Sequence, residues 1–390
     1  MASKTHLRRR VTDEERIEWA TLRFGFKEGK AVRAKDLVEK YDRAPAVITR
    51  GIQQAFTRGL VKVVPTVDFE GKDLQKRNTY LERRICERFP RLKTAIVIQV
   101  EPPPVGTMEM LTTYNNEVHQ KLGAALAKAI ANCPVDLDLN GKTIAFSSGR
   151  GVRDVVEELN RCPTLKANKV TLSSLTGNMF FQTSKTPFAP MDADQNVGNM
   201  RRCFPADVMI EIIGAALAPP PQRLEQLRRR TWLAKWDPAP DYAILGVGAL
   251  YGGHRFWDFA TSEETDGSEL YLAPIARTLR KLVSSCKNFA DQAPNYSPVA
   301  DIANHLFFVD PPKNVMIPPP QAASIKALIR KINRRLLNVQ AEQLKKIPDL
   351  ILVAGTRKKT LAILTLLNNF KNLTCLTVDS EVAASLLELE

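Results

Sequence analysis

The carboxy-terminal end of the chain constrains the fold most, because it has the pattern of a complete βαβ unit. Residues 350–354 form a short apolar run, typical of a strand buried in a parallel sheet. A helical period follows over 361–368, then a second apolar segment at 373–378. Asp379 or Ser380 is suited to cap the helix after it. The sequence therefore predicts an α/β fold built on a parallel sheet.

A basic loop lies inside this unit. Residues 355–359, Gly-Thr-Arg-Lys-Lys, come directly after the first predicted strand. Open α/β sheets bind ligands outside the carboxyl ends of their strands, and three cations there suit an anionic ligand. A solvated basic loop without a ligand is an equally simple explanation.

The charge of the chain points to a polyanionic partner. The 390 residues carry a net charge of +14, and residues 1–65 hold 15 Lys/Arg against 8 Asp/Glu, which is half of that excess. A basic terminal module favours nucleic acid as the partner. A generally basic surface is the alternative.

The cysteines and the hydropathy favour a cytoplasmic protein. The six cysteines are far apart and form neither CxxC pairs nor metal-ligand spacings with the four histidines, so free thiols in a reducing compartment are expected. The sequence shows neither a signal peptide nor an apolar run long enough to span a bilayer. We predict no metal site and no cofactor.

The amino-terminal module has the pattern of a helix-turn-helix. Helices are predicted over 14–26, 34–41 and 45–58, with a three-residue turn before Pro45 and a strand over 60–64. In such modules the second helix of the pair lies in the major groove. A three-helix protein-interaction module is the alternative.

The third helix presents side chains suited to DNA. Arginine and glutamine hydrogen-bond base edges, threonine contacts a thymine methyl or a phosphate, and a basic residue at the helix end suits phosphate. The predicted DNA-binding residues are Arg43, Ala46, Thr49, Arg50, Gln53 and Arg58.

A second candidate ligand loop follows a predicted strand at 142–146. Its residues 147–151, Ser-Ser-Gly-Arg-Gly, open a helix and offer backbone N–H groups, two hydroxyls and the charge of Arg150 to a phosphate. An ordinary tight turn explains the same pattern. Further along, 207–217 is predicted as an apolar helix.

Catalytic arrangements are weak in this sequence. His305 follows Asp301 at a helical i, i+4 spacing that would couple the two side chains, although a packed or surface histidine is the simpler explanation. Ser/His/Asp and Cys/His arrangements do not stand out. We predict no catalytic residue.

The segment 47–61, Val-Ile-Thr-Arg-Gly-Ile-Gln-Gln-Ala-Phe-Thr-Arg-Gly-Leu-Val, resembles the recognition helix of the SorC family of sugar-binding bacterial transcriptional regulators. Residues 81–98 resemble the family's entry into its effector domain. The resemblance implies a winged helix-turn-helix domain followed by a Rossmann-like α/β effector domain related to sugar-phosphate isomerases. It also implies a homo-oligomer, up to a tetramer.

The resemblance also implies an effector site on matching positions. The features of the family's site that match this sequence are the Ser-Ser-Gly-Arg-Gly loop, two glycine turns, an acidic residue and the lysine of a Gly-Gly-x-x-Lys loop. The implied effector-binding residues are Ser147, Ser148, Gly149, Arg150, Gly151, Gly177, Gly248, Asp301 and Lys359. The chain departs from the family pattern at Ser148, Gly151, Ala300 and Thr356.

Three segments follow from this interpretation. A DNA-binding domain is expected over 1–68, a linker over 69–80 and the effector-binding and oligomerisation domain over 81–390, with an insertion at 261–298. The expected function is a regulator whose affinity for operator DNA is controlled by a sugar or sugar-phosphate-like effector. The alternatives are a sugar-phosphate isomerase-like enzyme with a DNA-binding module, and a constitutive DNA-binding protein with a vestigial pocket.

Overall fold

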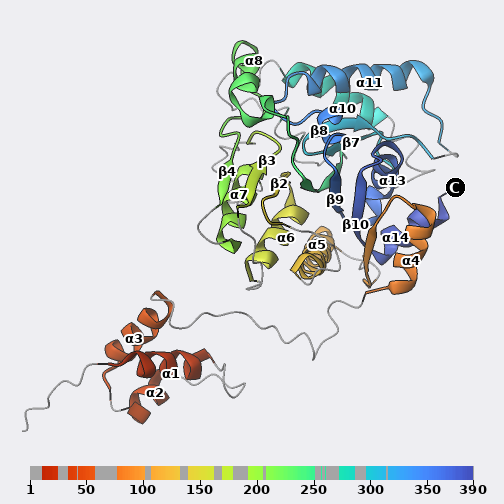
Figure 1. Ribbon diagram of the computed structural model, residues 1–390. Coiled ribbons are helices and arrows are strands. Elements are labelled where there is room, and N and C mark those ends of the chain that lie inside the picture. Colours follow the sequence, from red (N-terminus) through yellow and green to blue (C-terminus); the bar gives the residue numbers. More distant parts are fainter. Residues whose placement is uncertain are drawn as a thin grey trace, which may run out of the picture. The chain divides into compact units, whose positions relative to one another are not determined.

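The computed structural model divides the chain into two compact units, Met1–Val67 and Asp68–Glu390 (Figure 1). The structure describes residues 11–24, 34–41, 43–57, 77–101, 107–131, 139–161, 169–178, 192–204, 208–250, 256, 260, 272–285, 296–312 and 315–389. Among the helices within these ranges, none combines the length and the apolar character needed to cross a membrane.

The first unit contains three helices around a small core. They are α1 (Asp13–Phe24), α2 (Ala34–Tyr41) and α3 (Pro45–Thr57). Trp19, Leu37 and Ile48, one from each helix, are fully buried against one another. The three predicted helices are therefore confirmed to within two residues at each end, whereas the predicted strand at 60–64 lies outside the described residues.

Gly51 allows α3 to pack on α1. A Cβ atom at this position would lie 2.6 Å from Cζ3 and 2.7 Å from Cε3 of the buried Trp19 ring. Alanine gains about 1 kcal/mol of helix propensity over glycine, but overpacking a core costs about 1–3 kcal/mol. Thermal unfolding of Gly51→Ala should therefore show a less stable first unit. A midpoint equal to or above that of the wild type would contradict the contact.

The second unit is built on a seven-stranded sheet in which every pair of strands is parallel. The strand order is β1-β10-β9-β5-β2-β3-β4. The strands are β1 (Thr94–Ile98), β2 (Thr143–Phe146), β3 (Thr171–Ser174), β4 (Met209–Glu211), β5 (Tyr242–Leu245), β9 (Asp349–Val353) and β10 (Leu373–Asp379). The predicted carboxy-terminal βαβ unit and the α/β fold class are confirmed.

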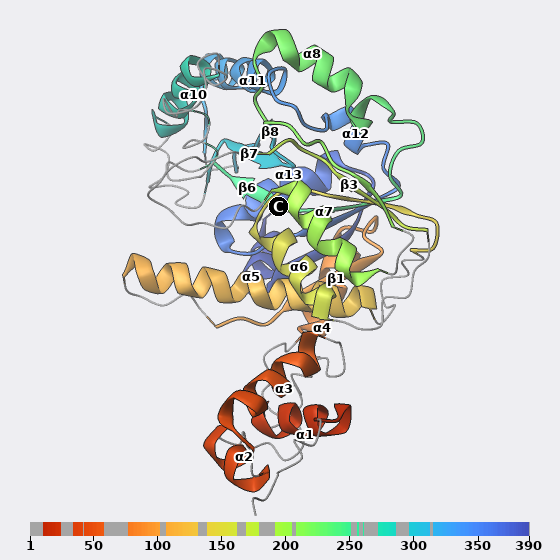
Figure 2. The same cartoon turned by 90° about the vertical axis from the view of Figure 1, so that its left-hand side faces the viewer.

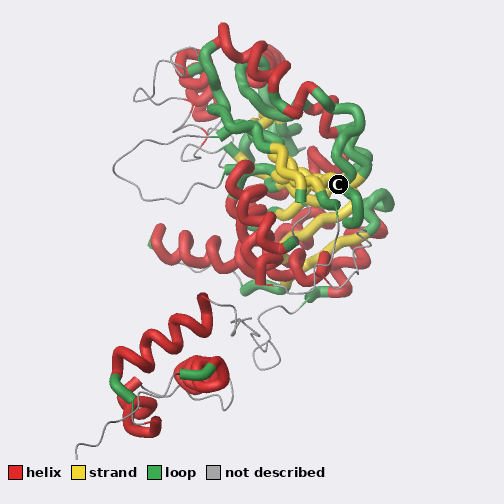
Figure 3. Tube along the Cα trace, turned by 60° about the vertical axis from the view of Figure 1, so that its left-hand side comes forward, coloured by secondary structure: helices red, strands yellow, loops and turns green. Residues whose placement is uncertain are grey.

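Helices cover both faces of this sheet, as Figure 3 shows. Alternate residues of each strand enter two cores, for example Ile351 and Val353 of β9 in one and Leu350 and Leu352 in the other. The first core is shared with α5 (Met108–Ala131), α6 (Arg150–Arg161) and α7 (Ala193–Met200). The second core is shared with α4 (Thr79–Arg88), α13 (Thr360–Asn369) and α14 (Ser380–Glu388).

A smaller antiparallel sheet, in the order β6-β7-β8, lies beyond the carboxyl end of β5. Its strands are β6 (Val247–Ala249), β7 (Val299–Ile302) and β8 (His305–Phe308). A third apolar core joins this sheet to α10 (Ala273–Ser285) and α11 (Pro319–Asn333). Further helices within the described residues are α8 (Pro221–Arg230), α12 (Ala341–Leu344) and the 3-10 turns η1 (Arg201–Cys203), η2 (Trp232–Ala234) and η4 (Arg357–Lys359).

The segment 261–298, predicted as an insertion, contributes α10 to this third core. Leu279 and Val283 of α10 are buried, and the helix packs along α11 (Figure 2). This part of the segment is therefore neither a surface loop nor a helix exposed on all sides.

One sequence prediction is wrong, and one helical pairing that the sequence allows is not formed. The predicted helix at 207–217 is instead the edge strand β4, parallel to β3, followed by irregular chain over 212–218. The short apolar run there also fits a strand, and pairing with β3 satisfies its backbone groups. Asp301 and His305 do not share a helix but lie on the two strands of the β7–β8 hairpin, where Ile302 is opposite His305.

Candidate functional site

The candidate effector site lies where the order of the strands in the sheet reverses. The chain leaves β2 toward β3 on one side, whereas it leaves the neighbouring β5 toward β9 on the other. Open α/β sheets bind ligands at such a switch point, outside the carboxyl ends of the strands. The loops after β2, β5 and β9 leave the sheet at this edge, and both candidate ligand loops are among them.

The loop after β2 is held by Ser147. Its hydroxyl donates to the carbonyl of Ser148 (3.0 Å) and accepts from the backbone N–H of Gly246 (3.1 Å). The Ser147 carbonyl accepts from the Asn196 amide (2.9 Å). Ser147 is fully buried, so its polar groups shape the loop rather than face a ligand.

The residues after Ser147 begin α6. Gly149 has φ +115 with open space where a Cβ would stand, and its carbonyl accepts from the N–H of Arg153 (3.0 Å). The free N–H groups of the first turn and the positive end of α6 therefore lie at the switch point. Gly151 is buried, and a Cβ there would lie 3.4 Å from the carbonyl oxygen of Val353 in β9.

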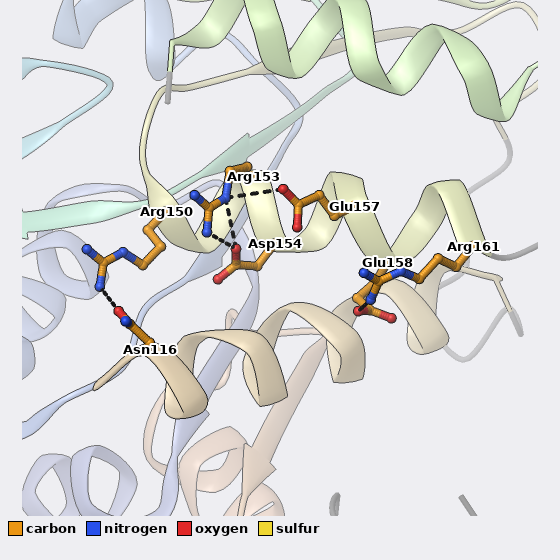
Figure 4. Close-up of polar contacts among 7 residues, drawn as sticks. All are labelled: Asn116, Arg150, Arg153, Asp154, Glu157, Glu158 and Arg161. Carbon is orange, nitrogen blue, oxygen red and sulfur yellow. Dashed lines mark hydrogen bonds and ion pairs between the residues drawn. The ribbon is translucent and has the colours of Figure 1, made fainter. Parts of the chain in front are cut away.

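Arg150 projects from the start of α6 toward α5 (Figure 4). Its guanidinium donates to the side-chain oxygen of Asn116. Burial lowers the pKa of Arg150, and the neighbouring charge of Arg153 lowers it further. Arg153 itself donates to Asp154 (2.7 Å) and lies 3.4 Å from Glu157, so it is occupied within α6. Arg150 is the cation of this helix that lies at the site.

The loop after β9 is fixed by Asp379 at the end of β10. One carboxylate oxygen accepts from the N–H of Thr356 (2.6 Å), and the other caps α14 by accepting from Val382 (2.8 Å). A Cβ on Gly355 would lie 2.5 Å from Leu122 of α5. Thr356 has φ +76, a left-handed conformation that favours glycine. The loop therefore adopts at Thr356 a backbone conformation that a residue with a side chain rarely takes.

Lys359 and Asp301 form an electrostatic pair at the site. Burial lowers the pKa of Lys359 to about 8, while the charges of Asp301 and Asp379 raise it and that of Arg150 lowers it. Burial raises the pKa of Asp301 to about 7, against the opposing effects of the backbone N–H of Asn304 and the charge of Lys359. The site therefore offers two cations and a carboxyl group that is partly protonated near neutral pH.

The two predicted glycines lie beside this pair. Gly248 of β6 is directly opposite Asp301 of β7. Gly177 follows Thr176, whose hydroxyl accepts from the Asn304 amide (2.9 Å). A Cβ on Gly177 would lie 2.8 Å from the carbonyl oxygen of Ala215, so this glycine permits a close approach of two backbones.

Two residues of α5 at the site were not predicted from the sequence. Asn116 accepts the hydrogen bond from Arg150, and the buried His119 lies near Arg150 and Lys359, whose charges add to burial in lowering its pKa. The His119 Nδ1 atom has no hydrogen-bond partner among the described residues. In the sequence, only the i, i+3 spacing of Asn116 and His119 on a predicted helix indicates that the two side chains lie on one side of it.

Tryptophans and basic residues are close together in the sequence between residues 228 and 257, and the tryptophans among them that the structure describes are used in packing. Trp232 stacks on Trp236 with ring centroids 5.0 Å apart, and each indole donates to a backbone carbonyl. Phe256 is buried. Trp257, His254 and Arg255 lie outside the described residues.

The candidate DNA interface is one face of α3. Ala46, Thr49, Arg50 and Gln53 are all exposed, and their i, i+3, i+4, i+7 spacing places them on one side of the helix. Arg43 is partly buried, with its guanidinium 3.6 Å from the Glu15 carboxylate. Arg58 lies outside the described residues.

The comparisons with known proteins agree with this architecture. Residues 326–388 match the model of a family described as a putative sugar-binding domain. This range contains η4 with Lys359, and β9, α13 and β10. Among curated proteins, no sequence matches this chain significantly.

Solved structures share the fold at low sequence identity. The full-length sorbitol operon regulator SorC from Klebsiella pneumoniae is 16% identical with a TM-score of 0.51, and the alignment covers 96% of this chain and 99% of that one. The probable sor operon regulator from Shigella flexneri is 17% identical with a TM-score of 0.53, over 80% of this chain and 99% of that one. The sugar-binding domain of a transcriptional repressor from Vibrio fischeri is 15% identical with a TM-score of 0.51, and the alignment covers 80% of this chain and 98% of that one.

The similarity to SorC extends over nearly the whole of both chains. The chain has the fold of the SorC-type sugar-binding transcriptional regulators, as its sequence predicted.

Proposed function

We propose that this chain is a DNA-binding transcriptional regulator whose affinity for operator DNA is controlled by a small sugar or sugar phosphate. The observation that carries the proposal is the placement of Arg150 after β2 and Lys359 after β9 at the switch point of the sheet, with Asp301 opposite Gly248 in the strand pair that follows β5. Such a regulator acts in the cytoplasm, where its DNA lies, and we expect a homodimer or tetramer because one small module rarely gives useful specificity.

The chemistry of the site suits an anionic carbohydrate. Lys359, Arg150 and the amino end of α6 favour a phosphate, and a carboxyl group such as that of Asp301 can hydrogen-bond sugar hydroxyls in either protonation state. On the DNA side, the exposed Arg50 and Gln53 are the residue types that read base edges. We therefore propose a binding function for the site rather than catalysis.

The proposal is tested by DNA binding with and without candidate effectors. The full chain is titrated with fragments from its own genomic neighbourhood at a stated salt concentration, and a panel of sugars and sugar phosphates is then added. The expected result is tight binding to one fragment that one compound shifts. Weak, equal binding to all fragments would contradict the proposal, and selective binding that no compound shifts would favour a vestigial pocket.

Effector affinity should fall at alkaline pH. A phosphate binds the protonated form of Lys359, whose pKa lies near 8, so raising the pH from 7 to 9 removes that proton. A single group with this pKa predicts a loss of about tenfold in effector affinity over that interval. Calorimetric titration at both pH values measures it, and Lys359→Gln should flatten the dependence. A steep dependence that persists in the variant would assign the proton to another group.

A further inference from the structure

Three helices of the second unit carry a large local excess of positive charge. The segments 221–230, 273–285 and 319–335, which contain α8, α10 and α11, hold twelve Lys/Arg and one acidic residue, Glu225. The net charge of the three segments is therefore +11, and the net charge of all 390 residues is +14. We call the surface of these three helices the basic face. It is separate from the effector site, and the proposed function above does not use it.

The three helices form one continuous structure. They lie together at the same end of the second unit in two perpendicular views (Figures 1 and 2). Arg228 of α8 donates to the carbonyl oxygens of Arg334 (3.1 Å) and Leu336 (3.0 Å) at the end of α11. α10 packs along α11. Three basic helices that are far apart in the sequence are thereby brought together, with Arg228 used in this packing and Arg229 paired with Glu225.

The charges on α11 form a row. Lys326, Arg330 and Arg334 are exposed and follow one another at i, i+4 spacing, about 6 Å apart along the helix axis. Like charges at this spacing destabilise a helix, and residues 319–335 contain no Asp or Glu to offset them. A row of this length fits a linear polyanion better than a single small anion.

The basic face is also hollowed. A groove of about 500 Å³ between α10 and α11 is lined by Ile275 and Leu328 and by the cations Lys331, Arg334 and Arg335. A concave surface lined by charges of one sign concentrates the field and attracts the opposite charge. Arginine outnumbers lysine on the three helices by nine to three. Its planar fork is the cation best suited to bidentate contact with phosphate.

We propose that the basic face binds the phosphate backbone of double-stranded DNA without reading its sequence. The proposed function already brings this protein to DNA, and the inference rests on it only for that reason. An acidic protein is the other possible partner. DNA is favoured because the face is rich in arginine and carries its charges in a row.

The test uses the full chain with a triple substitution, Lys326→Gln, Arg330→Gln and Arg334→Gln. The matched control is Arg91→Gln, Lys128→Gln and Lys371→Gln, three exposed cations on other elements. The dissociation constant for a long duplex of random sequence is measured across a range of salt concentrations. Each lost phosphate contact lowers the slope of log K against log salt by about 0.9. We expect the slope to fall by about 2 to 3 in the test variant and to be unchanged in the control.

Two further measurements separate the possible outcomes. An unchanged slope in the test variant overturns the proposal, and an unchanged thermal unfolding midpoint shows that the variant is folded. Binding of poly-glutamate is measured for the same variants. If the three substitutions weaken poly-glutamate binding but leave the DNA slope unchanged, the basic face binds an acidic protein and the proposal is overturned. The variant Arg50→Ala should retain the slope difference on random DNA, so failure of operator recognition and failure of the basic face are distinguishable.

Discussion

Replacing Lys359 by glutamine should shift the response of DNA binding to a phosphorylated effector to much higher effector concentrations. A charge-assisted hydrogen bond contributes about 1.5–3 kcal/mol, so effector affinity should fall roughly tenfold to more than a hundredfold. Glutamine removes the charge that Lys359 places near Asp301 and Arg150 and keeps a polar side chain there. The effector concentration that half-shifts the protein–DNA complex measures the effect.

The adjacent lysine provides the control. Lys358 stands on the same 3-10 turn, η4, but is exposed. Lys358→Gln should leave the effector response within about twofold of the wild type, because an exposed charge contributes little. Equal losses in both variants would mean that the general charge of the loop, rather than the position of Lys359, determines binding.

Gly123→Ala should destabilise the second unit and weaken effector binding at the same time. A Cβ on this residue of α5 would lie 2.7 Å from the backbone carbon of Asp154 and 2.9 Å from the nitrogen of Val155, both in α6. Backbone atoms cannot rotate away, so the two helices must separate. We expect a net loss of about 1–3 kcal/mol in the free energy of unfolding, even after a gain of roughly 1 kcal/mol in helix propensity.

This substitution reaches the site because Asn116 and Arg150 hydrogen-bond across the same pair of helices. Gly198 in α7 is a matched control, because a Cβ there meets nothing within 4 Å. Denaturant unfolding of Gly198→Ala should show equal or greater stability than the wild type. If Gly123→Ala and Gly198→Ala behave alike, the close packing of α5 on α6 is not as described.

The sequence predicts most of this fold because its strongest signals are local. The helices of the first unit and the strands β9 and β10 are marked by their own periodicity and caps, and Asp379 caps α14 as predicted. The run at 207–217 is not decided by local pattern, because a short apolar segment is compatible with helix and strand and only pairing with β3 distinguishes them.

The site was predicted in part for the same reason. Loops that follow strands, such as 147–151 and 355–359, are visible in the sequence. Asn116 and His119 were missed because they reach the site only through the packing of α5 on α6. The basic face was missed because its three segments are far apart in the chain. Ser147 was predicted to bind the effector, but its hydroxyl forms hydrogen bonds to the protein backbone instead.

The central claim is that one effector site and one DNA-binding surface are energetically coupled. Coupling between binding sites is reciprocal, so an effector that changes operator affinity by a given factor must have its own affinity changed by the same factor when the operator is bound. The decisive measurement is calorimetric titration of the effector into the free full chain and into the chain saturated with operator DNA. We predict that the ratio of the two effector dissociation constants equals the effector's effect on operator affinity. Equal effector affinities in the two states would show that the sugar site does not control DNA binding.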